Sequence, residues 1–353
     1  MFNKEPYINL LKALIATPSF SREEDKTATV IEHFIRQRGL PPQRAGNNVW
    51  VKSSQFEAGK PVVLLNSHHD TVKPVQGWQR NPHEPNEENG TIFGLGSNDA
   101  GASLVSLLAT FVYLNALPHR SYNLIYAATA EEEISGKNGI ASILEQLGTI
   151  NLGVVGEPTQ MQMAIAEKGL VVIDGEAKGK AGHAARNEGE NAIYKALQDI
   201  QWIQNYAFPK KSEWLGAVKA TVTQIEAGYQ HNVVPDSCKF VIDVRTQECY
   251  SNQEVVDVLQ QHTQSTLTPR SLRLNSSGIS VDHPIVQKGK ALGLSCYGSP
   301  TLSDQALLPF TTIKIGVGDS ARSHTANEYI LRKEIEQGID TYCQLLEGLE
   351  IFN

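Results

Sequence analysis

The sequence has no long hydrophobic run and little cysteine, and both shortages limit what the protein can be. No uninterrupted apolar segment approaches the roughly 18 residues that a membrane-spanning helix needs, and the opening residues show no basic stretch followed by an apolar run. We therefore expect no membrane partner and no export signal. The four cysteines, Cys238, Cys249, Cys296 and Cys343, form no C-x-x-C pair, which favours reduced thiols and a cytoplasmic protein.

Positive charge is also in short supply. Lysine and arginine number 31 against 38 aspartates and glutamates, so the formal net charge is −7. This balance argues against nucleic acid as a partner, because binding to phosphates needs a basic face. Small molecules and proteins remain as candidate partners. A chain of 353 residues with 41% hydrophobic residues is longer than a single core usually supports, so two domains are expected.

Helix and strand patterns alternate along the chain, which predicts an α/β fold. Apolar residues at helical spacing predict a helix over 7–15, and Ser21 with Glu24 predicts a capping box for the helix that follows. A long apolar segment, 104–114, predicts a buried crossover helix. Short apolar runs rich in β-branched residues predict strands of a mainly parallel sheet that is buried on both faces, at 61–65, 122–127, 152–155 and 311–315.

The pattern changes near residue 169. From there to about 279 the order is strand, helix, strand, strand, helix, strand, with the last strand predicted at 271–275. This order matches a ferredoxin-like βαββαβ unit. We therefore predict an inserted domain over 169–279 and a second domain formed by 1–168 and 280–353.

Five polar segments come at or soon after the predicted strands or just before the apolar helix. In open α/β sheets the carboxyl ends of the strands form the ligand-binding edge, so residues far apart in sequence can meet there. The segments contain His68 with Asp70, Asp99, the run Glu131 to Glu133, Glu157, and His324. His68 and Asp70 are two residues apart in extended chain and point to the same side, which places Asp70 to orient a metal-binding histidine.

Each segment alone also has an ordinary structural explanation. His68 and Asp70 could form a polar turn, and Asp99 could be the N-cap of the following helix. The glutamate run could be a solvated helix start, favoured by the helix dipole. Glu157 and His324 could be plain loop residues.

Together the segments supply a complete ligand set for two metal ions. If Asp99 bridges, one ion has His68 and Glu157, and the other has Glu133 and His324. Each ion keeps an open position for water, as zinc does in catalytic sites. Glu132 is then left over as a general base next to the activated water. Such a pair of ions would promote attack by water on a carbonyl group.

Six segments carry a resemblance to a known family: SHHDTV, GSNDAGA, TAEEE, GEPT, GKAGHAARNEGENAI and SHTANEY. In order and spacing they resemble the signatures of the acetylornithine deacetylase, succinyl-diaminopimelate desuccinylase, aminoacylase and glutamate carboxypeptidase family of co-catalytic zinc amidohydrolases. The resemblance implies a catalytic α/β domain interrupted by a ferredoxin-like lid that makes a homodimer. It also implies two divalent ions, zinc or cobalt, on His68, Asp99, Glu133, Glu157 and His324, with Asp70 behind His68 and Glu132 as the base.

The resemblance gives meaning to three residues of the inserted domain. His183 matches the histidine that completes the oxyanion-binding site, often across the dimer interface. Arg245 matches the arginine that receives the substrate carboxylate, and Asn232 matches an asparagine near the substrate. On sequence alone His183 could be an inert loop residue and Arg245 an exposed strand residue.

One departure leaves the substrate open. Many members of this family carry a lysine two residues after the bridging aspartate, whereas this chain reads Asp99-Ala100-Gly101. The expected activity is hydrolysis of an N-acyl-L-amino acid, foremost N-acetyl-L-ornithine or N-acetylcitrulline in arginine biosynthesis. The alternatives are desuccinylation of N-succinyl-diaminopimelate or N-succinyl-ornithine, cleavage of small peptides from the carboxyl end, and an inactive metal-binding dimeric scaffold.

Overall fold

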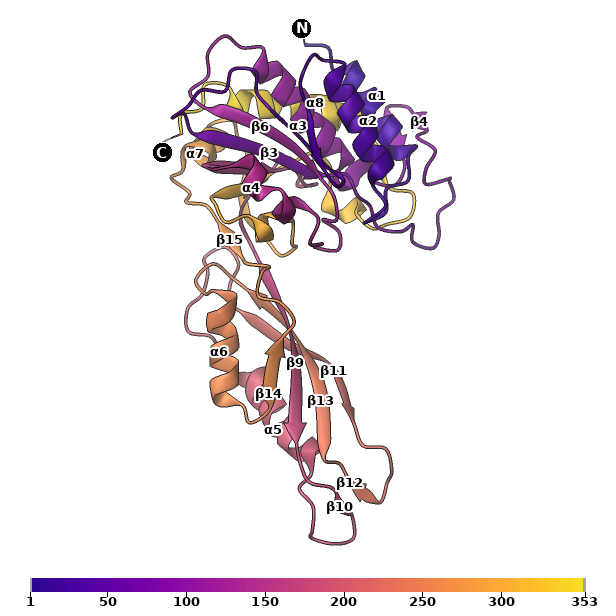
Figure 1. Cartoon of the computed structure of the whole chain (residues 1–353), viewed down its shortest axis with the longest axis vertical. Coiled ribbons are helices and arrows are strands. Elements are labelled where there is room, and N and C mark those ends of the chain that lie inside the picture. Colours follow the sequence, from indigo (N-terminus) through magenta and orange to yellow (C-terminus); the bar gives the residue numbers. More distant parts are fainter. Residues whose placement is uncertain (1, 352–353) are drawn as a thin grey trace. The chain divides into compact units, whose positions relative to one another are not determined.

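The predicted apolar strands form the middle of a nine-stranded sheet in the computed structural model, which describes residues 2–351 (Figure 1). Its strands are β1 Gln43–Ala45, β2 Asn48–Lys52, β3 Val62–His68, β6 Asn123–Thr129, β7 Leu152–Val155, β8 Met163–Glu167, β15 Ser277–Gly278, β16 Cys296–Ser299 and β17 Thr312–Lys314. The spatial order is β1-β2-β6-β3-β7-β17-β8-β15, with β16 paired to β8. The pairs β6 with β3, β3 with β7 and β7 with β17 are parallel, while β2 and β8 run antiparallel to their neighbours β6 and β17.

Both faces of this sheet are covered, which explains why its central strands are apolar throughout. Alternate residues of β3 enter different cores: Val63 and Leu65 face one core, and Leu64 faces the other. The larger core is made with α1 Glu5–Ile15, α2 Asp25–Arg36, α3 Ala102–Asn115, α7 Pro284–Ala291 and α8 Arg332–Leu346. The smaller core is made with η2 Ile140–Ser142, α4 Leu144–Leu147 and η3 Asp304–Leu307.

The capping box predicted for α2 is wrong. The helix begins at Asp25, after Glu24, and no side chain caps it. The Ser21 hydroxyl instead donates to Asp70 Oδ2 at 2.7 Å, and Glu24 accepts from the backbone N–H groups of Arg22 and Glu131. The side chains of Ser21 and Glu24 therefore bond to distant segments or to the preceding loop. The spacing of these residues in the sequence does not reveal such partners.

Shorter elements surround the edge of the sheet where the candidate ligands lie. A three-stranded sheet consists of β4 Glu87–Glu88, β5 Thr91–Phe93 and β18 Tyr329–Leu331. The turn η1 Ser97–Gly101 leads into α3, and η4 Ser320–Arg322 precedes β18. Among the described residues, no helix is both long enough and apolar enough to cross a bilayer.

The inserted segment forms a separate unit with its own core. Its elements are β9 Gly169–Lys178, β10 Gly182–His183, α5 Ala192–Asn205, β11 Lys219–Ala227, β12 Val233–Val234, β13 Ser237–Thr246, α6 Asn252–His262 and β14 Thr266–Pro269. Four strands form an antiparallel sheet in the order β11-β13-β9-β14, and β10 pairs with β12. Residues of α5 and α6 pack on one face of the sheet, where Val171, Phe240 and Val255 are buried. The α/β fold with an inserted βαββαβ unit is confirmed.

The last strand of this unit does not lie where the sequence predicted it. The strand β14 covers Thr266–Pro269, and the predicted range 271–275 is irregular. The side-chain amide of Asn252 donates to the carbonyl oxygens of Leu272 and Leu274, so these two groups are bonded to a helix residue. Leu267 supplies the buried side chain of the edge strand instead.

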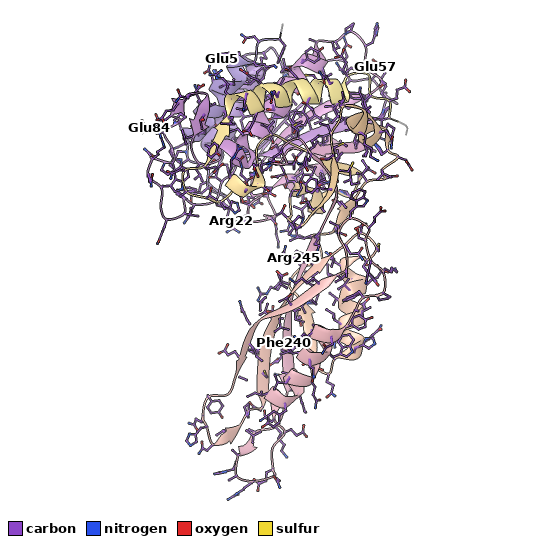
Figure 2. All side chains as sticks on the ribbon, turned by 180° about the vertical axis from the view of Figure 1, so that it is seen from behind. Glu5, Arg22, Glu57, Glu84, Phe240 and Arg245 are labelled. Atoms are coloured by element: carbon purple, nitrogen blue, oxygen red, sulfur yellow. The ribbon has the colours of Figure 1, made fainter. Side chains whose placement is uncertain are left out.

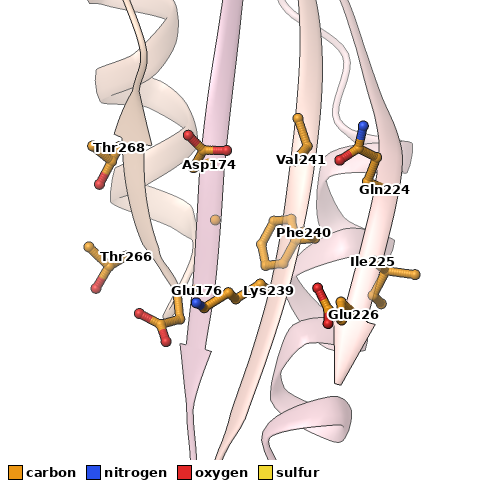
Figure 3. A pocket seen from close by; sticks show the side chains of 11 residues that line it. Asp174, Glu176, Gln224, Ile225, Glu226, Lys239, Phe240, Val241, Thr266 and Thr268 are labelled. Atoms are coloured by element: carbon orange, nitrogen blue, oxygen red, sulfur yellow. The ribbon is translucent and has the colours of Figure 1, made fainter. Parts of the chain in front are cut away.

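The chain divides into two compact units. One contains the residues up to Ile165, Gly278–Tyr297 and the residues from Ser303 onward, and the other contains Ala166–Ser277 with Gly298–Leu302. The segment 298–302 therefore belongs with the inserted unit, which the prediction did not include. On the face of the inserted sheet opposite its helices, charged and threonine side chains such as Asp174, Lys239 and Thr268 line a pocket (Figure 3).

Candidate metal centre

Three neighbouring strand ends supply most of the predicted ligands. His68 is the last residue of β3, Glu132 and Glu133 follow β6, and Glu157 follows β7. Because β3 lies between β6 and β7 and runs parallel to both, these side chains emerge at one edge of the sheet. The sequence prediction that these segments converge is therefore correct for this group.

Asp99 lies between the two histidines. Its Oδ1 is 3.3 Å from His68 Nε2, and its Oδ2 is 3.7 Å from His324 Nε2. His324 Nε2 is also 3.0 Å from Glu133 Oε2. Asp99 comes from η1 and His324 from the loop between η4 and β18, so only the tertiary fold brings them together. The two oxygens of one carboxylate each face a different histidine, which is an arrangement that can bridge two cations.

His68 has further carboxylates around it. Its Nε2 is 3.8 Å from Glu132 Oε2 and 3.8 Å from Glu157 Oε1. Ligand atoms of His68, Asp99 and Glu133 lie within 4.8 Å of one another, and so do those of His68, Glu132 and Glu157. The sequence predicted Glu132 as the general base and not as a metal ligand. In the structure, the Glu132 carboxylate lies as close to the candidate ion position beside His68 as the Glu157 carboxylate does.

The electrostatics of Glu157 fit a bound cation. Burial raises the pKa of Glu157 to about 8, and the charges of Asp99 and Glu133 contribute to the increase. Glu157 Oε1 is buried and has no hydrogen-bond partner among the described residues. A divalent ion would satisfy this oxygen and neutralise the crowded carboxylates. Imidazole nitrogen and carboxylate oxygen are ligands that zinc, cobalt and manganese accept, so these residues fit such a group.

Asp70 lies behind His68, and its carbonyl oxygen is closer to the ring than its carboxylate. His68 Nδ1 is 3.0 Å from the backbone oxygen of Asp70 and 3.5 Å from its carboxylate Oδ1. The carboxylate is occupied by the backbone N–H groups of Glu132 and Glu133, at 3.1 and 3.2 Å, and by the hydroxyl of Ser21. Asp70 therefore faces His68 with both its carbonyl and its carboxylate, and it also holds the glutamate segment with its side chain.

Two buried carboxylates near the site were missed by the sequence analysis. Asp304 is 2% exposed, and its Oδ2 accepts from Asn66 Nδ2 at 2.8 Å and from Thr129 Oγ1 at 2.6 Å. Glu328 is also 2% exposed and accepts hydrogen bonds from the turn that carries Asp99. Glu328 belongs to the SHTANEY segment, which was a usable signal, whereas Asp304 has the sequence context of an ordinary turn.

The three predicted substrate residues of the inserted unit do not form one cluster. His183 is an exposed residue of β10, and its Nδ1 accepts from the N–H of Ala185. The backbone oxygen of Asn232 accepts from Ala184, so Asn232 lies close to His183. Arg245 lies near the C-terminal end of β13, a strand of the inserted unit (Figure 2).

A separation along β13 keeps Arg245 away from His183. Arg245 pairs with Leu170 at the start of β9, whereas Ser237 pairs with Lys178 at its end, close to β10. Eight residues of strand correspond to about 26 Å. The Nε and Nη2 atoms of Arg245 donate to both carboxylate oxygens of Asp243, at 2.8 and 3.1 Å, so one edge of the guanidinium is already occupied.

Comparison with known proteins places the chain in a family. Residues 64–348 match the model of peptidase family M20/M25/M40, which is most of the chain. The chain belongs to peptidase family M20/M25/M40. This M20 chain is 26% identical to the [LysW]-lysine/[LysW]-ornithine hydrolase of Sulfurisphaera tokodaii, over 96% of this chain and 94% of that protein. It is 23% identical to the succinyl-diaminopimelate desuccinylase of Acinetobacter baumannii, over 98% and 99% of the two chains.

Solved M20 structures share the fold of this chain. The YXEP protein of Bacillus subtilis, described as a dinuclear metal-binding peptidase of the M20 family, aligns with a TM-score of 0.74 at 17% identity. The alignment covers 98% of this chain and 99% of that structure. Membership of the M20 family makes this chain a hydrolase of a metal-binding peptidase family, in keeping with the two groups of candidate ligands.

Proposed function

We propose that this M20 protein hydrolyses the amide bond of an N-acyl-L-amino acid at the centre formed around Asp99. The observation that supports this most strongly is the position of Asp99, whose two oxygens face His68 and His324 separately. In the proposal the ligands are His68, Asp99, Glu133, Glu157 and His324. Divalent ions, when bound there, supply Lewis-acid polarisation of the scissile carbonyl and make water more acidic.

Glu132 is the proposed general base and acid. Its carboxylate takes a proton from the attacking water while the water oxygen bonds to the acyl carbon, and it later gives that proton to the nitrogen as the C–N bond breaks. Burial raises the pKa of Glu132 well above its usual value, and the neighbouring carboxylates Glu157, Asp304 and Glu133 add to the increase. A carboxylate of raised pKa accepts and holds a proton more readily, which suits this double role.

The proposed substrate is N-acetyl-L-ornithine, or N-acetylcitrulline, as the resemblance of the signature segments implies. Arg245 would receive the substrate carboxylate through the donors that Asp243 leaves free, since an arginine can bind a carboxylate with two parallel hydrogen bonds. Asn232 and His183 would contact the substrate and the developing oxyanion. The proposed ions are zinc or cobalt, and the proposed assembly is a homodimer.

A second candidate is supported by the relatives. The similar proteins named above act on a succinylated amino acid or on lysine and ornithine carried by LysW, and each match covers nearly the whole chain. All these reactions release an amino group from an amide, so the same centre can perform them. These substrates differ in the acyl group and in the amino acid, so the residues that contact those two parts would decide between them.

Release of free amine from a substrate panel tests the proposal. The panel contains N-acetyl-L-ornithine, N-acetylcitrulline, N-succinyl-L-ornithine, N-succinyl-diaminopimelate and LysW-lysine, with EDTA-treated protein before and after addition of zinc or cobalt. We expect metal-restored cleavage of the acetyl substrates, and the Glu132→Ala variant measures the background from contaminating enzymes. Cleavage of succinyl or LysW substrates alone would favour the second candidate. Failure to cleave any of them with metal bound would contradict both.

A further inference from the structure

Glu328 lies buried against the turn that carries Asp99 and bonds to it at several points. Its Oε1 accepts from the backbone N–H groups of Asn98 and Asp99, at 2.8 and 2.9 Å, and its Oε2 accepts from Gly96 at 3.0 Å. The backbone oxygen of Glu328 also accepts from the N–H of Gly94 at 3.0 Å. Four N–H groups of the segment 94–99 are therefore held by one residue.

The same turn has a second connection to the loop that leads to His324. The side-chain oxygen of Asn98 accepts from the N–H of Asp319 at 2.9 Å, and its side-chain nitrogen donates to the Asp319 oxygen at 3.0 Å. Gly318 allows this close approach, because a Cβ at that position would lie 2.4 Å from Asn98 Oδ1. The segment with Asp99 and the segment with His324 are thus joined before and after the histidine.

The chemistry of the Glu328 contact requires a carboxylate. Three N–H donors converge on its two oxygens, and an ionised carboxylate has only acceptors. A glutamine of the same shape would offer one oxygen and would direct an NH₂ group at an N–H group. The buried N–H groups of the turn would then lose partners, and buried donors are normally paired in folded proteins.

We propose that Glu328 is a positioning residue that sets the bridging carboxylate of Asp99 at a fixed place relative to His324. This inference rests on the metal centre assigned under the proposed function. Glu328 itself is not a proposed metal ligand, because both of its carboxylate oxygens accept from backbone N–H groups of the turn. It acts on ion binding through the backbone of residues 96–99, so its loss weakens the site without removing a ligand.

Titration of metal-free protein with Zn²⁺ in a calorimeter tests the proposal for the wild type, Glu328→Gln and Glu254→Gln. Glu254 is a matched control, since its carboxylate also accepts from a backbone N–H group, that of Ser251, but in the inserted unit. We expect Glu328→Gln to bind at least one ion roughly 10–100-fold more weakly, as is typical when a group behind a metal ligand is lost. Glu254→Gln should bind both ions like the wild type.

Amide hydrogen exchange supplies a second readout that does not depend on metal binding. In metal-free wild-type protein we expect the amides of Gly96, Asn98 and Asp99 to be protected, and in Glu328→Gln we expect that protection to be lost in this segment only. Wild-type Zn²⁺ affinity at both positions of Glu328→Gln, or free exchange of these amides in the wild type, would overturn the inference. If the wild type itself bound no Zn²⁺, the proposed metal centre would fail instead.

Discussion

Three consecutive glutamates take three different positions. Glu131 is buried, and its carboxylate accepts from the backbone and side-chain nitrogens of Asn138. Glu132 Oε2 lies 3.8 Å from His68 Nε2, and Glu133 Oε2 lies 3.0 Å from His324 Nε2. The backbone of Glu131 has a positive φ of 55°, so the chain turns sharply where the strand ends. Asp70 and Glu24 hold this turn in place. The turn separates Glu131, which supports the loop, from Glu132 and Glu133, which lie in the candidate site.

At the residue scale, Glu132→Gln should lower turnover roughly 10²–10⁴-fold, because glutamine cannot carry a proton between water and the leaving nitrogen. We expect the variant to keep bound metal, since the predicted ligands remain in place. Steady-state kinetics and metal analysis of the same samples check this. A variant with near-normal turnover would show that another group serves as the base, and loss of metal would assign Glu132 to the ligands.

At the scale of elements, the N-terminal helix, the small sheet and the last helix are connected by one carboxylate. Glu87 of β4 accepts from Lys12 of α1 at 2.6 Å and from Arg332, the first residue of α8, at 2.7 and 2.9 Å. These bonds lower the pKa of Glu87 to about 2. The side chain is partly exposed, so we expect the network to stabilise the fold only modestly.

The stabilisation by Glu87 should depend on pH with a definite sign. A carboxylate of lowered pKa stabilises the folded state above its unfolded pKa, near 4.5, and this contribution is lost as the pH falls through about 2. Glu87→Gln should therefore lower the free energy of unfolding by about 1 kcal/mol at neutral pH. The difference from the wild type should shrink below about pH 4.5, as measured by urea unfolding at several pH values. A difference that stays constant down to pH 2.5 would contradict the role of the charge.

At the scale of the whole molecule, the two units divide the proposed machinery between them. The unit that contains the nine-stranded sheet holds all five proposed ligands and Glu132, whereas His183, Asn232 and Arg245 belong to the inserted unit. Within that unit His183 and Arg245 lie near opposite ends of a long sheet. A single inserted unit therefore does not easily bring His183 and Arg245 to the same substrate molecule. The proposed homodimer removes this difficulty if His183 contacts the substrate bound to the partner subunit.

Mixing two inactive variants tests that arrangement. Glu132→Ala and His183→Ala should each be inactive alone. If His183 serves the partner subunit, a mixed dimer has one site with both residues intact, and random reassociation should restore roughly a quarter of the wild-type activity. Co-expression of the two variants followed by an amine-release assay measures this. Absence of recovery, with mixed dimers shown to form, would place His183 at the site of its own subunit.

The predictable part of the fold follows from local chemistry. Apolar β-branched runs of four to six residues and a helical apolar segment over 104–114 are patterns with a short period, so β3, β6, β7 and α3 could be located from sequence. The predictions that failed concern residues whose local structure depends on a partner far away in the sequence. The hydroxyl of Ser21 bonds to Asp70 and not to a helix end, and the segment 271–275 gives two carbonyl oxygens to Asn252 and forms no strand.

The candidate site shows the same division. The sequence by itself identified the side chains that we propose carry the chemistry, because histidine and carboxylate residues at strand ends are recognisable as a class. Only the tertiary structure decided their geometry: the carbonyl of Asp70 behind His68, the position of Glu132 within ligand reach, and the attachment of the Asp99 turn to Glu328. The bond between Asp99 and Glu328 joins residues 229 positions apart, and contacts over such separations depend on how whole strands and turns pack.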